Sequence, residues 1–350
     1  MKKILLAGYY GFGNLGDEAI LEMVLKQVLE ITNKDNITVL SGNKATTNRK
    51  YNIGTIHRYD VISIIRKLKA SYILVFGGGS LLQDVTSKRS IYYYLFLIRL
   101  AKLMGNKVVM LSQGIGPLVS ENSKKSVAKT LNMVDYITVR DKYSKVFLGS
   151  IGVDINKVYL SADPVICLRD NENYENNNDN IKRVCFSLRN WKGSDVGEKI
   201  SSITEMLINN GIECYFIPFY YDEDLELIFN IEKKIGNRAI YYKEKLSTNE
   251  AYDIIKEMNL LVGVRLHSLI FAATANVPFV AVSYDQKVDQ FANSLNMNVS
   301  CNIDDIDSDL LFKEIMEKLE NESEEKKLLY NEVINLRESI NVNYEILKKI

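Results

Sequence analysis

The sequence predicts an α/β protein of two lobes that face a cleft, each with a mostly parallel sheet, followed by C-terminal helices. Short apolar runs alternate with segments of helical periodicity in the first half of the chain, and the alternation restarts in the second half. Such alternation is typical of βαβ units. The 350 residues suit about two domains, and a cleft between two such lobes is the default ligand site.

The first lobe covers residues 1–169 in this prediction. Its strands are buried apolar runs, and the helix after the first run carries apolar residues along one face. The expected strands are residues 3–7, 37–40, 71–76, 107–111 and 136–139. Ligand-binding residues are expected in the loops that follow the carboxyl ends of these strands.

A polar stretch, residues 170–180, has only Tyr174 as a core-forming residue and is interpreted as a linker. The second lobe follows as residues 181–322, and a charged helical segment, 323–350, is expected to pack back on the lobes. The second lobe's expected strands are residues 183–188, 212–216, 260–264 and 278–283. The apolar anchors of the C-terminal helices are expected to be Leu328, Leu329, Val333, Leu336 and Ile340.

Composition excludes several classes of protein. Hydrophobic residues make up 47% and charged residues 25%, which is ordinary globular usage. Lys+Arg and Asp+Glu both number 44, so no nucleic-acid partner is expected. The four cysteines show no C-x-x-C pairing, and no cluster of metal ligands is present, so neither a metal nor a cofactor is expected. The first apolar run ends by Ala7, too early for a signal peptide, which favours a cytoplasmic protein.

Residues 11–16 match G-x-G-x-x-G between an expected strand and helix. Small residues there let backbone N–H groups approach an anion, but a tight turn for helix–sheet packing explains the pattern equally well. The next strand ends at residues 39–42 without the carboxylate that a nicotinamide cofactor requires. Asn14 and Asp17 add polar side chains, and Asp17 is either a helix cap or a catalytic or sugar-binding carboxylate.

Residues 77–80 (GGGS) and 112–117 (SQGIGP) look like two further glycine-rich loops after strands of the first lobe. Three such loops at one sheet edge are more than packing usually demands. They predict a polar ligand along this edge.

The second lobe carries the sharper signal, because Arg265 and His267 lie where a strand ends and a helix begins. Arg189 and Lys287 follow other strands of the same expected sheet. Arginine forms a bidentate fork with carboxylate or phosphate, and histidine exchanges protons near neutral pH. A lone histidine is more often structural, which is how His57 is interpreted, but an adjoining arginine favours an anion pocket with a proton donor.

An aromatic run at residues 92–96 has two interpretations, a peripheral contact with a membrane or, more commonly, a helix packed in the core. Residues 91–98 form the densest apolar stretch. Arg99 and Lys102 end it well short of a membrane-spanning length.

Several of these segments together resemble the CsaB-type polysaccharide pyruvyl transferase family. They are GYYGFGNLGDEAI (8–20), GGGS (77–80), QGIGP (113–117), VRD (139–141), ADP (162–164), SLR (187–189), VRLH (264–267) and YDQKV (284–288). The first and the VRLH segments are individually fairly specific, and all occur in the family's order.

The resemblance implies two Rossmann-like lobes like those of GT-B glycosyltransferases. It also implies transfer of pyruvate from phosphoenolpyruvate onto two hydroxyls of one sugar as a cyclic ketal. The acceptor would be an N-acetylmannosamine in a lipid-linked amino-sugar disaccharide, a secondary cell-wall polymer precursor used for S-layer anchoring. Such an enzyme would work in the cytoplasm, at the inner face of the membrane.

The family motifs and the loop positions together give the expected site. The residues expected to act in catalysis are His267, Asp17 and Arg265. The residues expected to bind the donor are Arg189, Arg265, Leu266, His267 and Lys287. The residues expected to bind the acceptor are Asn14, Asp17, Gly78, Gly79, Gln113 and Arg140.

Two other classes of function remain open at this point. A nucleotide-sugar-dependent GT-B glycosyltransferase would share the architecture, but the second lobe shows no acidic pair spaced to bind a ribose. A sugar-binding or scaffold protein would leave the Arg/His cluster unexplained.

Overall fold

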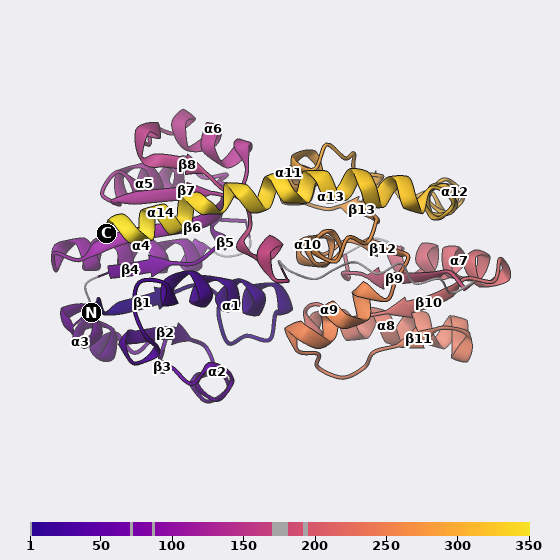
Figure 1. The fold of residues 1–350 in the computed structure, drawn as a ribbon, viewed down its shortest axis with the longest axis horizontal. Helices are drawn as coiled ribbons and strands as arrows, with labels where there is room; N and C mark the ends of the chain where they lie inside the picture. The colour runs from indigo at the N-terminus through magenta and orange to yellow at the C-terminus, as the bar shows by residue number, and fades with distance from the viewer. Residues whose placement is uncertain (1, 71–72, 86–87, 170–180, 192–194) are drawn as a thin grey trace. The chain divides into compact units, whose positions relative to one another are not determined.

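Two parallel sheets organise the computed structural model, which describes residues 2–70, 73–85, 88–169, 181–191 and 195–350 (Figure 1). Unit 1 comprises the chain up to Phe12 together with Asp17–Pro164 and Leu336–Ile350. Unit 2 comprises Gly13–Gly16 and Val165–Asn335. The linker expected at residues 170–180 lies outside the described residues.

The described strands of unit 1 form one sheet in the order β3-β2-β1-β4-β6-β7-β8, with β5 paired to β6, and every pairing is parallel. The chain runs from β1 through β2 to β3 on one side of the sheet and then crosses to β4 on the other side of β1. This is the doubly wound order of a Rossmann fold. The strands are β1 (Ile4–Ala7), β2 (Ile37–Ser41), β3 (Gly54–His57), β4 (Ile73–Phe76), β5 (Gly79–Leu82), β6 (Lys107–Ile115), β7 (Tyr136–Val139) and β8 (Val158–Leu160).

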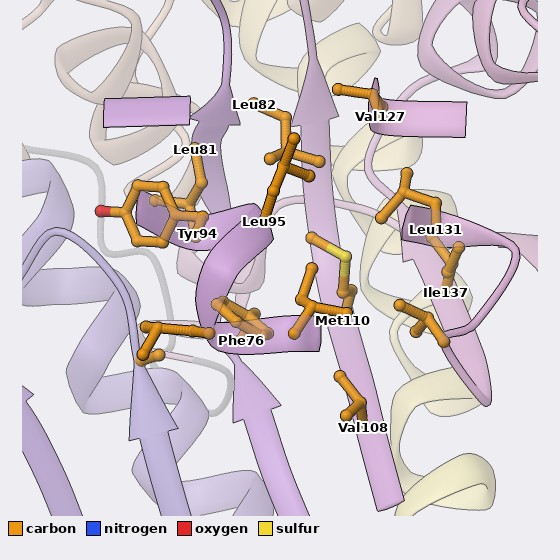
Figure 2. Packing of buried hydrophobic residues seen from close by; sticks show 14 of the residues in the cluster. Phe76, Leu81, Leu82, Tyr94, Leu95, Val108, Met110, Val127, Leu131 and Ile137 are labelled. Atoms are coloured by element: carbon orange, nitrogen blue, oxygen red, sulfur yellow. The ribbon is translucent and has the colours of Figure 1, made fainter. Parts of the chain in front are cut away.

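Helices pack against this sheet and bury an apolar core, in which Phe76, Met110 and Ile137 of the strands meet Leu95 and Leu131 of helices (Figure 2). Burial of such side chains stabilises the unit by roughly 1.5–3 kcal/mol each. The helices are α1 (Leu15–Leu29), α2 (Lys44–Tyr51), α3 (Val61–Ala70), α4 (Lys88–Leu103), α5 (Glu121–Leu131), α6 (Lys142–Ser150) and α14 (Asn341–Lys349).

Unit 2 repeats the design with a parallel sheet in the order β11-β10-β9-β12-β13-β14. The strands are β9 (Arg183–Ser187), β10 (Glu213–Phe216), β11 (Ile240–Tyr241), β12 (Leu260–Gly263), β13 (Phe279–Ser283) and β14 (Cys301–Asn302). The helices are α7 (Val196–Asn209), α8 (Tyr221–Ile235), α9 (Thr248–Lys256), α10 (Leu266–Thr274), α11 (Gln286–Ser294), α12 (Ser308–Glu320) and α13 (Glu322–Ser339). Short 3-10 segments lie at Lys34–Asn36, Ile155–Lys157, Pro164–Cys167, Gly236–Arg238 and Ile303–Asp305.

The predicted fold class is confirmed, with two parallel-sheet units of GT-B type and C-terminal helices. Two details of the prediction are wrong. Gly79–Leu82 and the whole of Lys107–Ile115 are strands, so residues 79–80 and 112–115 are not loops. Leu328, expected as an apolar anchor, is exposed, whereas Leu329 and Val333 are buried as expected.

The aromatic run on α4 divides between core and surface. Tyr94 is buried in the unit 1 core, whereas Tyr92 and Phe96 are exposed. The expected core packing therefore applies to only one face of the helix. Among the described residues, no helix combines the length and the apolar character needed to cross a bilayer.

A buried asparagine fixes α14 against the sheet of unit 1. Asn343 is fully buried, accepts a hydrogen bond from the Thr138 hydroxyl (2.7 Å) and donates to the Ser112 hydroxyl (2.9 Å). Its amide nitrogen also lies 3.4 Å from Gln27 Oε1. The residues from Leu336 onward thus belong to unit 1 through a hydrogen-bonded polar contact as well as apolar packing.

Asn343→Ala should lower the free energy of unfolding by about 1–3 kcal/mol, because it leaves buried hydroxyls and an amide acceptor without their partner. Thermal or urea unfolding measures this loss. Asn341→Ala is the matched control, since Asn341 is exposed on the same helix. Equal stability of the two variants would show that the Asn343 contacts are energetically neutral.

Candidate active site

The candidate donor residues gather at the carboxyl edge of the unit 2 sheet. Arg189 follows β9, Arg265 follows β12 and Tyr284 follows β13. These three strands are neighbours in the sheet, so parallel pairing brings residues from distant parts of the sequence to one edge. Ligands of doubly wound sheets bind at this edge.

Tyr284 is the centre of this group. The guanidinium carbon of Arg189 lies 4.8 Å from the Tyr284 ring centroid, and Lys287 Nζ lies 4.9 Å from it. The Trp191 ring packs beside Tyr284 with centroids 5.5 Å apart. Within the described part of the chain, Arg189 makes neither an ion pair nor a hydrogen bond, and its contacts are with the Trp191 and Tyr284 rings. Its N–H fork is therefore available for a carboxylate or phosphate.

Arg265 is held differently, by two acids at the start of α8. Its guanidinium forms an ion pair with buried Asp224 and donates to Glu223 at 2.9 Å. Asp224 also accepts from the backbone N–H groups of Phe219 (3.1 Å) and Tyr220 (2.8 Å). Burial alone would lower the pKa of Arg265, but the adjacent Asp224 carboxylate raises it above its ordinary value. Some of the N–H groups of the Arg265 guanidinium are thus already bonded within the protein, and Asp224 fixes the orientation of the guanidinium.

His267 is the second residue of α10, and its ring lies directly against Gly16. A Cβ on Gly16 would stand 2.0 Å from His267 Nδ1, so only glycine fits there. Residues 13–16 belong to unit 2, where Leu15 N–H donates to Phe219 O (2.9 Å) and Asn14 pairs with Tyr220 in an antiparallel bridge. Leu266, also expected in the donor site, is buried at the start of the same helix.

The G-x-G-x-x-G segment is a tight turn with positive φ at Gly11 (80°) and Gly13 (77°). Its N–H groups serve the protein itself, since Gly11 donates to Glu18 Oε1 (2.7 Å) and Gly16 donates to Asn14 Oδ1 (3.0 Å). Asn14 therefore caps α1. Asp17 stands in the first turn of that helix.

Gly16→Ala should lower turnover strongly because the added methyl group must displace the His267 ring. Gly197→Ala is the matched control. Gly197 is likewise the second residue of a helix, and its Cβ would meet only the flexible end of Leu227 at 3.1 Å. Turnover of both variants, measured beside their melting temperatures, tests the expectation. Normal turnover in Gly16→Ala would show that the position of His267 is unimportant.

The expected acceptor residues other than Asn14 lie in unit 1. Asp17 faces β5, with its Oδ1 3.6 Å from the Cβ position of Gly79. Arg140 donates to Asp163 (2.8 Å) and to Ser80 (3.1 Å).

Two expected acceptor residues are packed against the interior of unit 1. A Cβ on Gly78 would lie 3.2 Å from Pro164, so the backbone is close-packed there. Gln113 is fully buried, and its amide donates to the carbonyls of Gly77 and Leu111 at 2.9 Å. The side chain of Gln113 thus holds the glycine segment in place.

Asp224 and Arg58 were missed by the sequence analysis. Asp224 carries no local signal, because its partner is 41 residues away. Arg58 is buried among the rings of Tyr9, Phe12, Tyr59, Tyr93 and Tyr94, with its guanidinium 4.6–5.7 Å from their centroids. Across the described residues, no cluster of histidine, cysteine or carboxylate side chains could hold a metal ion.

Structural comparison identifies the fold. The chain superposes on the S. aureus MnaA–UDP co-structure with a TM-score of 0.65, at 13% identity over 94% of this chain and 91% of that one. For Anabaena Alr3699/HepE in complex with UDP and glucose the TM-score is 0.65, at 10% identity over 100% and 99%. For UDP-GlcNAc 2-epimerase from Neisseria meningitidis bound to UDP-GlcNAc it is 0.66, at 10% identity over 99% and 100%. These low identities establish a shared fold alone.

Sequence comparison identifies the family. No curated protein matches the chain significantly. The family model described as polysaccharide pyruvyl transferase matches residues 14–286, well over half of the sequence. The match begins at Asn14, two residues before the Gly16 that contacts His267, and ends at Gln286, two residues after Tyr284. The chain therefore belongs to the polysaccharide pyruvyl transferase family.

Proposed function

We propose that this transferase moves pyruvate from phosphoenolpyruvate onto two hydroxyls of one sugar as a cyclic ketal. The observation that carries the proposal is the group of Arg189 and Lys287 around Tyr284, beside an Arg265 already fixed by Asp224. Phosphoenolpyruvate has a carboxylate and a phosphate. An arginine fork without an ion pair to any described residue and a nearby ammonium group suit two such anions.

In this proposal the cations bind and neutralise the donor's anionic groups, and His267 supplies a proton. Arg189 and Lys287 bind the donor's anionic groups, and Arg265 neutralises charge that develops on the departing phosphate. His267 places a proton on the methylene carbon, which becomes a methyl group while a sugar hydroxyl attacks the adjacent carbon. The bond from that carbon to the phosphate oxygen breaks. A second hydroxyl then closes the ketal.

The acceptor is proposed to bind to unit 1, with the Asp17 carboxylate as the group that accepts a proton from a sugar hydroxyl. Asp17, Gly79 and Arg140 come from neighbouring parts of that unit, and the Arg140–Asp163 pair fixes the guanidinium next to Ser80. We propose an N-acetylmannosamine of a lipid-linked cell-wall precursor as the acceptor class. The resemblance to CsaB-type members supports it.

Donor binding separates this proposal from a nucleotide-sugar glycosyltransferase. Titration calorimetry of the purified chain should detect phosphoenolpyruvate binding, which Arg189→Ala weakens, and should detect no comparable binding of UDP. Tight UDP binding without phosphoenolpyruvate binding would overturn the proposal and favour the glycosyltransferase class.

A further inference from the structure

The Tyr284 hydroxyl lies in an unusual electrostatic setting. Lys287 Nζ lies over the Tyr284 ring, 4.9 Å from its centroid, and Arg189 and Arg265 add their positive charges from the ends of two neighbouring strands. Two of these three cations have carboxylate partners of their own. Asp285 Oδ2 lies 3.4 Å from Lys287 Nζ, and the Asp224 and Glu223 carboxylates form ion pairs with Arg265.

Arg189, which has no carboxylate partner among the described residues, places its positive charge beside the Tyr284 ring. Burial alone would raise the pKa of Tyr284, but Lys287, Arg189 and Arg265 together lower it below its ordinary value. Burial instead raises the pKa of other tyrosines among the described residues, such as Tyr215 and Tyr241, both to about 12. Tyr284 is therefore suited to proton transfer in a way that these tyrosines are not.

Ketal formation requires two proton deliveries. The two sugar hydroxyls together release two protons, of which one ends on the methyl carbon and the other on the departing phosphate. In the proposed function His267 supplies the first. The second needs a donor beside the phosphate, and the cations that would bind phosphate, Arg189 and Lys287, lie 4.8 Å and 4.9 Å from the centroid of the Tyr284 ring.

We propose that Tyr284 is a second acid–base residue of the donor site, whose hydroxyl protonates the phosphate oxygen as its bond to carbon breaks. Lys287 and Arg189 stabilise the phenolate that remains, and a proton released by the sugar restores the phenol. This inference rests on the proposed function, because it assumes that the departing group is phosphate.

The first experiment needs no substrate. Absorbance of phenolate is followed against pH in the wild type, Tyr284→Phe and the control Tyr215→Phe, in which the lost hydroxyl bonded Glu213. Below pH about 10, the ordinary tyrosine value, the wild type and the control should show more phenolate absorbance than Tyr284→Phe. Lys287→Met should move that ionisation to higher pH. Coincident curves for the wild type and Tyr284→Phe below this pH would overturn the inference.

The second experiment measures turnover. Tyr284→Phe should lower kcat by about 10²-fold or more, with a much smaller change in KM for phosphoenolpyruvate, and Tyr215→Phe should not. Wild-type kcat should fall at high pH through the ionisation seen by absorbance, and Tyr284→Phe should lack that fall. Normal kcat in Tyr284→Phe would refute the role of Tyr284 and leave the proposed function standing. Absence of wild-type turnover with phosphoenolpyruvate would instead refute the proposed function and this inference with it.

Discussion

His267→Ala should lower kcat about 10²–10⁴-fold, the contribution of one positioned general acid, while affinity for phosphoenolpyruvate falls much less. The ring is fixed against Gly16 at the first turn of α10, two residues after Arg265. His267→Gln retains hydrogen bonding without proton transfer, so it should be nearly as slow.

Steady-state kinetics against pH distinguishes proton transfer from positioning. His57→Ala is the control, because His57 ends β3 in unit 1 and its Nδ1 accepts from the Tyr59 backbone (3.3 Å). The fall at high pH that is attributed to Tyr284 should remain in His267→Gln, whereas a kcat of His267→Gln close to that of the wild type would assign the proton to another group. His267 would then serve only to position the phosphate.

Arg189→Ala should weaken phosphoenolpyruvate binding by about 1.5–3 kcal/mol, the scale of a charged hydrogen bond, while the melting temperature changes little. The reason is that Arg189 has no carboxylate partner among the described residues whose loss would destabilise the fold. Arg189→Lys keeps the charge without the fork and should recover only part of the affinity.

Arg265→Ala should lower both stability and donor affinity, in contrast to Arg189→Ala, which should lower donor affinity only. It leaves Asp224 buried without its cation, so we expect a loss of about 3–5 kcal/mol in stability in addition to weaker binding. Calorimetric affinity and thermal unfolding of both variants test the distinction. If the Michaelis constant for phosphoenolpyruvate is unchanged in Arg189→Ala, that residue does not bind the donor.

The fold class was predictable because the central strands are continuous apolar runs. β1, β4 and β13 are buried along their whole length, so hydrophobicity alone marks them. β3, β11 and β14 lie at sheet edges, only partly buried. An edge strand shows little apolar pattern, which explains why these strands escaped prediction.

The candidate site was predictable only in part. Arg265 and His267 stand next to a strand end, so their position follows from the local pattern. The partners that define their roles come from elsewhere, since Asp224 lies on α8 and Gly16 on the first turn of α1. Tyr284 stands in a recognisable segment, but its surrounding cations become visible only when the sheet brings three strand ends together.

The most direct test of the central claim is the product formed from phosphoenolpyruvate and a lipid-linked amino-sugar disaccharide in D2O. Mass spectrometry and NMR should show a pyruvate ketal whose methyl group carries one deuterium from solvent, with one phosphate released for each ketal. An acceptor left unchanged by phosphoenolpyruvate, but extended by a sugar when a UDP-sugar is supplied, would contradict the account.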